Sequence, residues 1–189
     1  MALNEEKIAR LVRELLIEIG EDPTREGLLD TPKRVAKAFE FLTSGYRTDA
    51  KQLINGACFT QETSSMVIVK DIEVYSMCEH QMLPFFGRCH IGYIPSGTVF
   101  GVSKLARLVD VYARRLQLQE RLTEQISNVV MASVNAKGVG VIIEARHLCM
   151  MMRGVEKQNS TMVTSSVLGE FRDSLATREE FFSLIGRRT

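Results

Sequence analysis

The chain has 189 residues, a length that is enough for one domain with a sizeable core, and 45% of them are hydrophobic and 25% are charged. Its formal net charge of +1 gives no global electrostatic case for binding nucleic acid or an anionic membrane. The N-terminus lacks the basic start and apolar run of a secretory signal, and no apolar run approaches the roughly 18 residues of a membrane span. Four cysteines without an export signal predict a cytoplasmic protein, in which neighbouring Cys and His residues favour metal or catalytic chemistry over a disulfide framework.

Two amphipathic helices are predicted first along the chain. Apolar residues at three- and four-residue spacing predict a helix over residues 4–19, with Asn4 as its N-cap. The second helix begins at Thr31-Pro32, with Thr31 as the N-cap and Pro32 at the first helical position, and ends at Gly45.

The character of the chain then changes. Residues 47–65 form the only candidate linker, so we expect an N-terminal helical region over 1–63 and a second domain over 64–189. In the second domain we predict strands over 65–77 and 87–94, followed by a helix from Ser103 and a helix over 119–136. Strands over 139–146 and 161–167 and a capping-box helix from Thr177 complete it. Because consecutive strands pair most readily as hairpins, this order predicts an α+β fold with an antiparallel sheet and a helix pair on one face.

Two cysteines lie close to histidines, in Cys78-Glu79-His80 and His147-Leu148-Cys149. Each group follows a predicted strand. If the two strand ends meet in the sheet, two thiolates and two imidazoles converge, which is a plausible zinc constellation. Two buried cysteines with unrelated histidines are the alternative reading of the same pattern.

Cationic side chains recur at helical spacing. Lys104 and Arg107 are one turn apart at the start of a helix that we expect Ser103 to cap, and such a helix start can hold phosphate groups. The remaining cations of this kind are Arg34 and Lys37, at the same spacing, and Arg153, which follows the second cysteine. Solvated helix faces are the alternative explanation for each pair.

Glu120 precedes an apolar helical stretch. It can complement the charge of the helix N-terminus. Alternatively, its carboxylate can accept two parallel hydrogen bonds from the N1–H and 2-amino edge of guanine.

Taken together, these segments resemble the GTP cyclohydrolase I family over nearly the whole chain and in the right order. The matching stretches are EDPTREGLLDTPKRVAKAF, SMCEHQMLPFFGRCHIGYIP, GVSKLARLVDVYARRLQLQERLTEQI and IEARHLCMMMRGVEKQNSTMVTSSVLGEF. The resemblance implies a tunnelling fold (T-fold): a four-stranded antiparallel sheet with two helices on one face, preceded by N-terminal helices. It further implies that subunits pair their sheet edges into pentamers, that two pentamers form a decamer, and that the active sites lie between subunits.

The resemblance also implies a reaction and its residues. The family converts GTP and water to formate and 7,8-dihydroneopterin triphosphate, with a zinc-activated water attacking guanine C8. Cys78 and Cys149 match the two zinc thiolates, and His147 and His80 match the catalytic histidines. Glu120, with Gln119 beside it, matches the guanine anchor, and the ribose and triphosphate contacts match Ser103, Lys104, Arg107, Arg153, Arg34 and Lys37.

Gln81 departs from the family, which has Cys-Glu-His-His where this chain has Cys-Glu-His-Gln and uses the second His as the third zinc ligand. Since a carboxamide is a poorer zinc ligand than imidazole, three interpretations follow: weak coordination by Gln81, recruitment of His80 to the metal, or a metal-free pair of thiols that can oxidise. We expect GTP binding to survive better than turnover. The alternative functions are a catalytically inactive GTP-binding homologue and a protein with a purely structural zinc.

Overall fold

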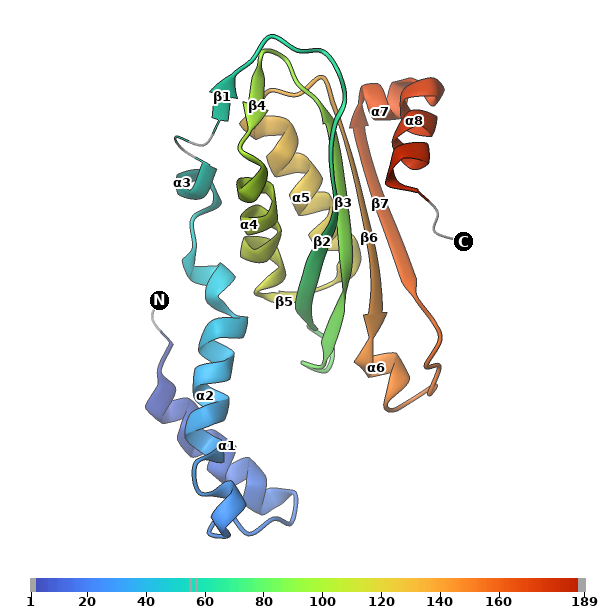
Figure 1. The fold of residues 1–189 in the computed structure, drawn as a ribbon. Helices are drawn as coiled ribbons and strands as arrows, with labels where there is room; N and C mark the ends of the chain where they lie inside the picture. The colour runs from blue at the N-terminus through green and yellow to red at the C-terminus, as the bar shows by residue number, and fades with distance from the viewer. Residues whose placement is uncertain (1–2, 55, 57, 187–189) are drawn as a thin grey trace.

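The computed structural model describes residues 3–54, 56 and 58–186. Its centre is a sheet with the strand order β5-β2-β3-β6-β7 (Figure 1). The four long strands are antiparallel neighbours, namely β2 (Val67–Cys78), β3 (Pro84–Ile94), β6 (Gly138–His147) and β7 (Met162–Gly169). The two-residue β5 (Leu116–Gln117) joins the β2 edge in parallel. The predicted four-stranded antiparallel sheet is therefore confirmed.

Helices α4 (Val102–Ala113) and α5 (Gln119–Ser133) cover one face of this sheet (Figure 1). Their apolar faces and the inward residues of the strands form the main core, in which Phe85, Leu108 and Ile126 are completely buried. Fully burying one such side chain stabilises the fold by about 1.5–3 kcal/mol. The α+β arrangement with two helices on one face is thus confirmed.

The opposite face of the sheet carries a second, smaller core. Helices α7 (Glu170–Asp173) and α8 (Leu175–Ile185) lie at one end of this face, where Phe171 and Phe181 pack edge to face with ring centroids 5.3 Å apart. The predicted capping box is wrong in register, because the side chain of Ser174, rather than Thr177, caps α8 by accepting from the N–H of Thr177.

The N-terminal helices α1 (Glu5–Glu18) and α2 (Thr31–Leu42) pack on each other and extend away from the sheet (Figure 1). Asn4 caps α1 as predicted, since its side chain accepts from the N–H of Lys7 at 2.9 Å. The N-cap of α2 is Asp30, one residue earlier than predicted, and it makes no side-chain capping bond. Short 3-10 turns precede and follow α2 at Glu26–Leu28 and Ser44–Arg47.

The predicted linker contains secondary structure. Helix α3 (Ala50–Ile54) places Ile54 in the main core, and β1 (Cys58–Thr60) pairs with β4 (Thr98–Phe100). The division of the chain near residue 63 stays a prediction. Within the described residues, every helix is too short or too polar to cross a membrane.

Candidate active site

The Cys78 side of the site is a tight turn between β2 and β3. The N–H of Cys78 donates to Leu83 O at 2.9 Å, and the N–H of Met82 donates to Cys78 O at 2.8 Å. Met82 has a φ of 56°, in the left-handed region that closes the turn. Cys78 is buried at the end of β2, whereas His80 and Gln81 are exposed on the turn itself.

The sheet register brings the second cysteine to this turn. Phe85, early in β3, pairs with His147 at the end of β6, and the short helix α6 (Leu148–Met151) then carries Cys149. Burial raises the pKa of the Cys149 thiol, and the neighbouring Cys78 thiol raises it further. The structure therefore brings the two cysteines together at the ends of β2 and β6, which both pair with β3.

His147 is held from two sides. Its ring stacks on Phe85, with centroids 4.6 Å apart and planes 6° apart, and its Nε2 lies 2.8 Å from Gln119 Oε1. Burial lowers the pKa of His147, and the nearby Glu120 carboxylate partly offsets this effect. The other ring nitrogen, Nδ1, lies 4.0 Å from Cys149 Sγ, at the limit of a thiol hydrogen bond.

The surroundings of Gln119 determine the tautomer of that histidine. Gln119 is only 1% exposed, and its Nε2 donates toward Ile143 O, Met162 O and Thr164 Oγ1 at 3.0, 3.0 and 3.1 Å. Because three acceptors surround the amide nitrogen, the amide oxygen must face His147. His147 therefore donates from Nε2 and presents an unprotonated Nδ1 toward Cys149. The Gln119 side chain is thus buried between His147 and the backbone of β6 and β7, and it does not reach the surface.

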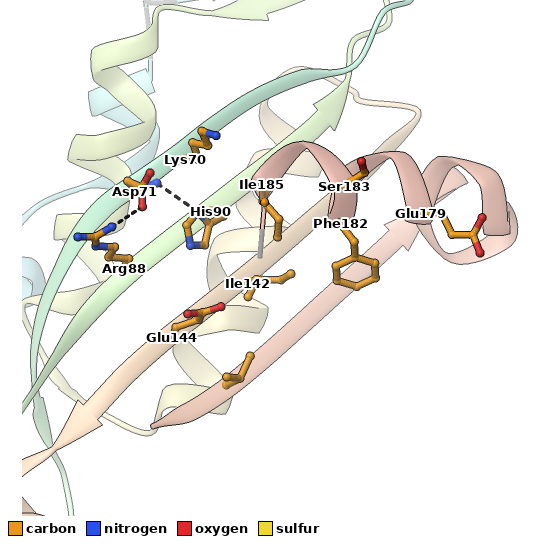
Figure 2. A pocket seen from close by; sticks show the side chains of 12 residues that line it. Lys70, Asp71, Arg88, His90, Ile142, Glu144, Glu179, Phe182, Ser183 and Ile185 are labelled. Atoms are coloured by element: carbon orange, nitrogen blue, oxygen red, sulfur yellow. Dashed lines mark hydrogen bonds and ion pairs between the residues drawn. The ribbon is translucent and has the colours of Figure 1, made fainter. Parts of the chain in front are cut away.

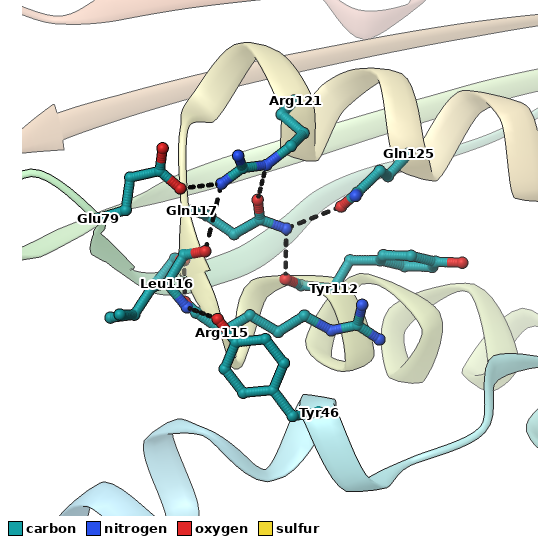
Figure 3. A network of polar contacts seen from close by, with 9 residues as sticks. Tyr46, Glu79, Tyr112, Arg115, Leu116, Gln117, Arg121 and Gln125 are labelled. Atoms are coloured by element: carbon teal, nitrogen blue, oxygen red, sulfur yellow. Dashed lines mark hydrogen bonds and ion pairs between the residues drawn. The ribbon is translucent and has the colours of Figure 1, made fainter.

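Glu120 and the Cys78 turn are linked through the start of α5. Glu120 is exposed in the first turn of this helix. The next residue, Arg121, forms an ion pair with Glu79 of the turn, and this contact lowers the pKa of Glu79. Arg121 Nε also donates to Gln117 Oε1 at 3.0 Å (Figure 3).

The Gln117 amide completes that polar network. Its Nε2 donates to Tyr112 O and Gln125 Oε1, each at 2.9 Å, so the buried side chain joins α4, β5 and α5 (Figure 3). Sequence reasoning did not find Gln117, Arg121 or Phe85 as parts of the site. Their types and spacing carry no chemical signature, although Phe85 belongs to the core-facing alternation of β3.

Ordinary zinc ligands fit the site at two positions only. The described residues contain no group of three or more His, Cys, Asp or Glu side chains that could hold a metal ion. Cys78 and Cys149 supply a pair of neighbouring sulfur donors, which suits zinc. Gln81 on the adjoining turn offers only a neutral carboxamide oxygen as a third donor.

A single chain does not bring all the predicted cations to this centre. Arg153 lies close enough to the thiols to favour the Cys149 thiolate. Lys104 lies in the first turn of α4, which is about 18 Å long and begins beside β4, away from β5 and α6, whereas Arg107 lies near the middle of this helix (Figure 1). Gly101 is the N-cap of α4, and the exposed Ser103 lies inside the helix, so the predicted Ser103 cap is wrong.

The last predicted pair of cations, Arg34 and Lys37, is exposed on α2. Arg34 forms an exposed ion pair with Asp30 at 3.3 Å. Because α2 packs mainly on α1 and extends away from the sheet, these two residues are also remote from the thiols within one chain.

Comparisons with known proteins identify the family of the chain. A sequence profile described as GTP cyclohydrolase I matches residues 8–186. GTP cyclohydrolase 1 of Methylococcus capsulatus is 60% identical over 178 residues, covering 94% of this chain and 96% of that protein. GTP cyclohydrolase 1 of Chromohalobacter salexigens is 59% identical over 180 residues, covering 95% and 98%. The apo structure of an archaeosine synthase QueF-Like protein has a TM-score of 0.48 at 22% identity, covering 57% of this chain and 97% of the other, a likeness too weak to support an argument. The profile match and the two relatives show that the chain belongs to the GTP cyclohydrolase I family.

Proposed function

We propose that this chain hydrolyses GTP to formate and 7,8-dihydroneopterin triphosphate. The observation that carries the proposal is the environment of His147, whose ring is fixed by Phe85 and Gln119 beside two neighbouring thiols. An imidazole held in one tautomer is suited to proton transfer with a bound base.

Glu120 anchors the guanine in this proposal. Its carboxylate is exposed and lies near enough to influence the pKa of His147. A carboxylate accepts the N1–H and 2-amino groups of guanine as a pair of parallel hydrogen bonds. Gln119 orients His147 through its Nε2–H, so consecutive residues of one helix turn bind the base and position this histidine, which must take up a proton on Nδ1 before it can donate one to N7 of the base.

Zinc is part of the proposal, with Cys78 and Cys149 as thiolate ligands and Gln81 at the third position. A zinc ion bound there would supply an acidified water. Since loss of a group that merely supports a ligand costs about 10–100-fold in metal affinity or activity, a carboxamide in place of imidazole should reduce zinc occupancy at least as much. The exposed His80 is then either catalytic or a substitute ligand.

The triphosphate is bound across copies of the chain. Four negative charges need several cations, yet Lys104 at the start of α4 and Arg34 and Lys37 on α2 lie away from the thiols within one chain. Neighbouring copies would complete the site, as expected for a decamer of two pentamers. The solvent-facing edge of β7, where Val163 is 59% exposed, can pair with another copy. All four cysteines are free thiols, which suits the proposed cytoplasmic location.

The decisive experiment measures bound zinc per chain and formate released from GTP for the parent chain and for Gln81→His. We expect Gln81→His to raise both by at least about 10-fold. Gln61→His, which adds a histidine at an exposed position outside the site, is the matched control and should change neither.

The outcomes separate the remaining interpretations. If the parent already holds one zinc per chain and turns over as fast as Gln81→His, the proposed impairment is wrong. If Gln81→His binds GTP yet gains neither zinc nor formate release, the chain is a GTP-binding homologue without catalysis.

A further inference from the structure

A cavity lies on the sheet face opposite α4 and α5. It has a volume of about 1110 Å³ and is bounded by strands β2, β3, β6 and β7 and by helix α8 (Figure 2). None of the residues assigned above to GTP, zinc or proton transfer lines it. The cavity is therefore separate from the candidate active site.

His90 presents a hydrogen-bond donor to this cavity. The side chain is only 7% exposed, and its Nδ1 accepts from the backbone N–H of Asp71 at 3.2 Å. Because Nδ1 accepts, the neutral ring carries its proton on Nε2. Burial lowers the pKa of His90 and so favours this neutral form.

The Nε2–H group of His90 opens to the cavity. It has no hydrogen-bond partner among the described residues, yet no buried side-chain nitrogen or oxygen in that part of the chain lacks a partner. Nε2 must therefore be accessible. Figure 2 shows the ring directed into the space between the strands and α8.

Glu144 places acceptors beside that donor. Across the β3–β6 pair, Glu144 is opposite Arg88, and His90 is opposite Ile142, so Glu144 is diagonal to His90 on the same face. Such diagonal neighbours are about 7–8 Å apart, and their Cβ atoms are somewhat closer. Arg88 is engaged by Asp71 at 2.8 Å, whereas the Glu144 carboxylate forms no hydrogen bond or ion pair with any described side chain.

Apolar groups complete the lining. Ile142 lies opposite His90 and two residues before Glu144 on β6, and the ring of Phe182, which is 43% exposed, faces the same space from α8 (Figure 2). A flat heteroaromatic ring can pack on such surfaces while its edge meets the polar groups.

We propose that this cavity is a second ligand site, which binds a guanine (2-amino-6-oxopurine) or pterin (2-amino-4-oxopteridine) ring. The edge of such a ring offers two adjacent N–H donors next to a carbonyl oxygen. The Glu144 carboxylate accepts the two donors as a fork, and His90 Nε2–H donates to the carbonyl. Adenine-type rings lack both the carbonyl and the 2-amino group, and are therefore excluded. The site does not depend on catalysis at the thiol centre.

Equilibrium dialysis with guanosine tests the proposal, with adenosine as the comparison ligand. Glu120→Ala removes the proposed anchor at the active site, and this variant should still bind one guanosine per chain. Adding Glu144→Ala should weaken that binding at least about 10-fold. Adding Glu73→Ala instead is the matched control, because Glu73 is an exposed carboxylate on the same sheet face that does not line the cavity.

Four results would contradict or support the second site. Loss of all guanosine binding in Glu120→Ala would overturn the second site, as would equal binding by Glu120→Ala with and without Glu144→Ala. Equal affinity for adenosine and guanosine would overturn the proposed edge recognition. A change in the His90 imidazole NMR signals on adding guanosine to Glu120→Ala would support the location directly. Failure of the GTP hydrolysis proposal would leave these binding results unaffected.

Discussion

Replacing Gln119 with leucine should separate the positioning of His147 from the binding of substrate. The leucine keeps the volume of the side chain but removes the amide that fixes the Nε2–H tautomer through a contact of 2.8 Å. It also removes the two N–H donors that three acceptors on β6 and β7 share.

The size of the effect follows from these contacts. Leaving a buried donor or acceptor unsatisfied costs about 1–3 kcal/mol, so losing two donors should lower the free energy of unfolding by about 2–6 kcal/mol. Typical domains have about 5–15 kcal/mol of stability, and the variant should remain folded. Positioned acid–base groups contribute about 10²–10⁴-fold, and we expect kcat to fall by about 10²-fold.

Urea unfolding measures the loss of stability, and formate release from GTP measures the loss of kcat. Gln81→His is present in both Gln119→Leu and its parent, so that turnover is high. The matched control is Thr123→Val, because Thr123 is 1% exposed and its hydroxyl contacts Gln119 O and Thr164 Oγ1, each at 2.7 Å, without touching His147. The control should lose about 1 kcal/mol of stability and keep its kcat. A folded Gln119→Leu chain whose kcat stays within about twofold of its parent would refute the positioning role.

Three further predictions concern other parts of the molecule. Gly87→Ala should lower the free energy of unfolding by about 1–3 kcal/mol in urea titrations, because the added Cβ atom would lie 1.9 Å from Glu144 O. An unchanged midpoint of urea unfolding would show that β6 shifts freely to make room. Arg121→Met should lower kcat, because it removes the ion pair that holds Glu79 and the Cys78 turn, and it should also lower the melting temperature, because it removes the donor to the buried Gln117 Oε1; full activity would contradict the role of the ion pair. Finally, the free energy of unfolding should fall as the pH drops below about 6.5, because the pKa of His90 is lower in the folded chain than the ordinary 6.5, so the unfolded chain takes up the proton first. His90→Asn should flatten this dependence, and an equally steep pH profile in that variant would assign it to other groups.

Much of the architecture could be predicted from local pattern. Apolar spacing found α1, α2, α4 and α5, and strand alternation with hairpin pairing found the antiparallel sheet. Helix starts were less accurate, at Thr31, Ser103 and Thr177, because several capping residue types stand close together there and only backbone geometry selects one of them.

The sequence by itself determined which chemistry is available: two thiols beside histidines, a carboxylate that can accept two parallel hydrogen bonds, and a glutamine directly after Cys78-Glu79-His80. Only the tertiary structure decided how these groups act. The pairing of Phe85 with His147 depends on strand register, and a shift of one residue would turn each side chain to the other face of the sheet. The inward orientation of Gln119 depends on acceptors from β6 and β7, which are distant in sequence. The cavity between the sheet and α8 likewise exists only because Phe171 and Phe181 hold the C-terminal helices over one end of that face.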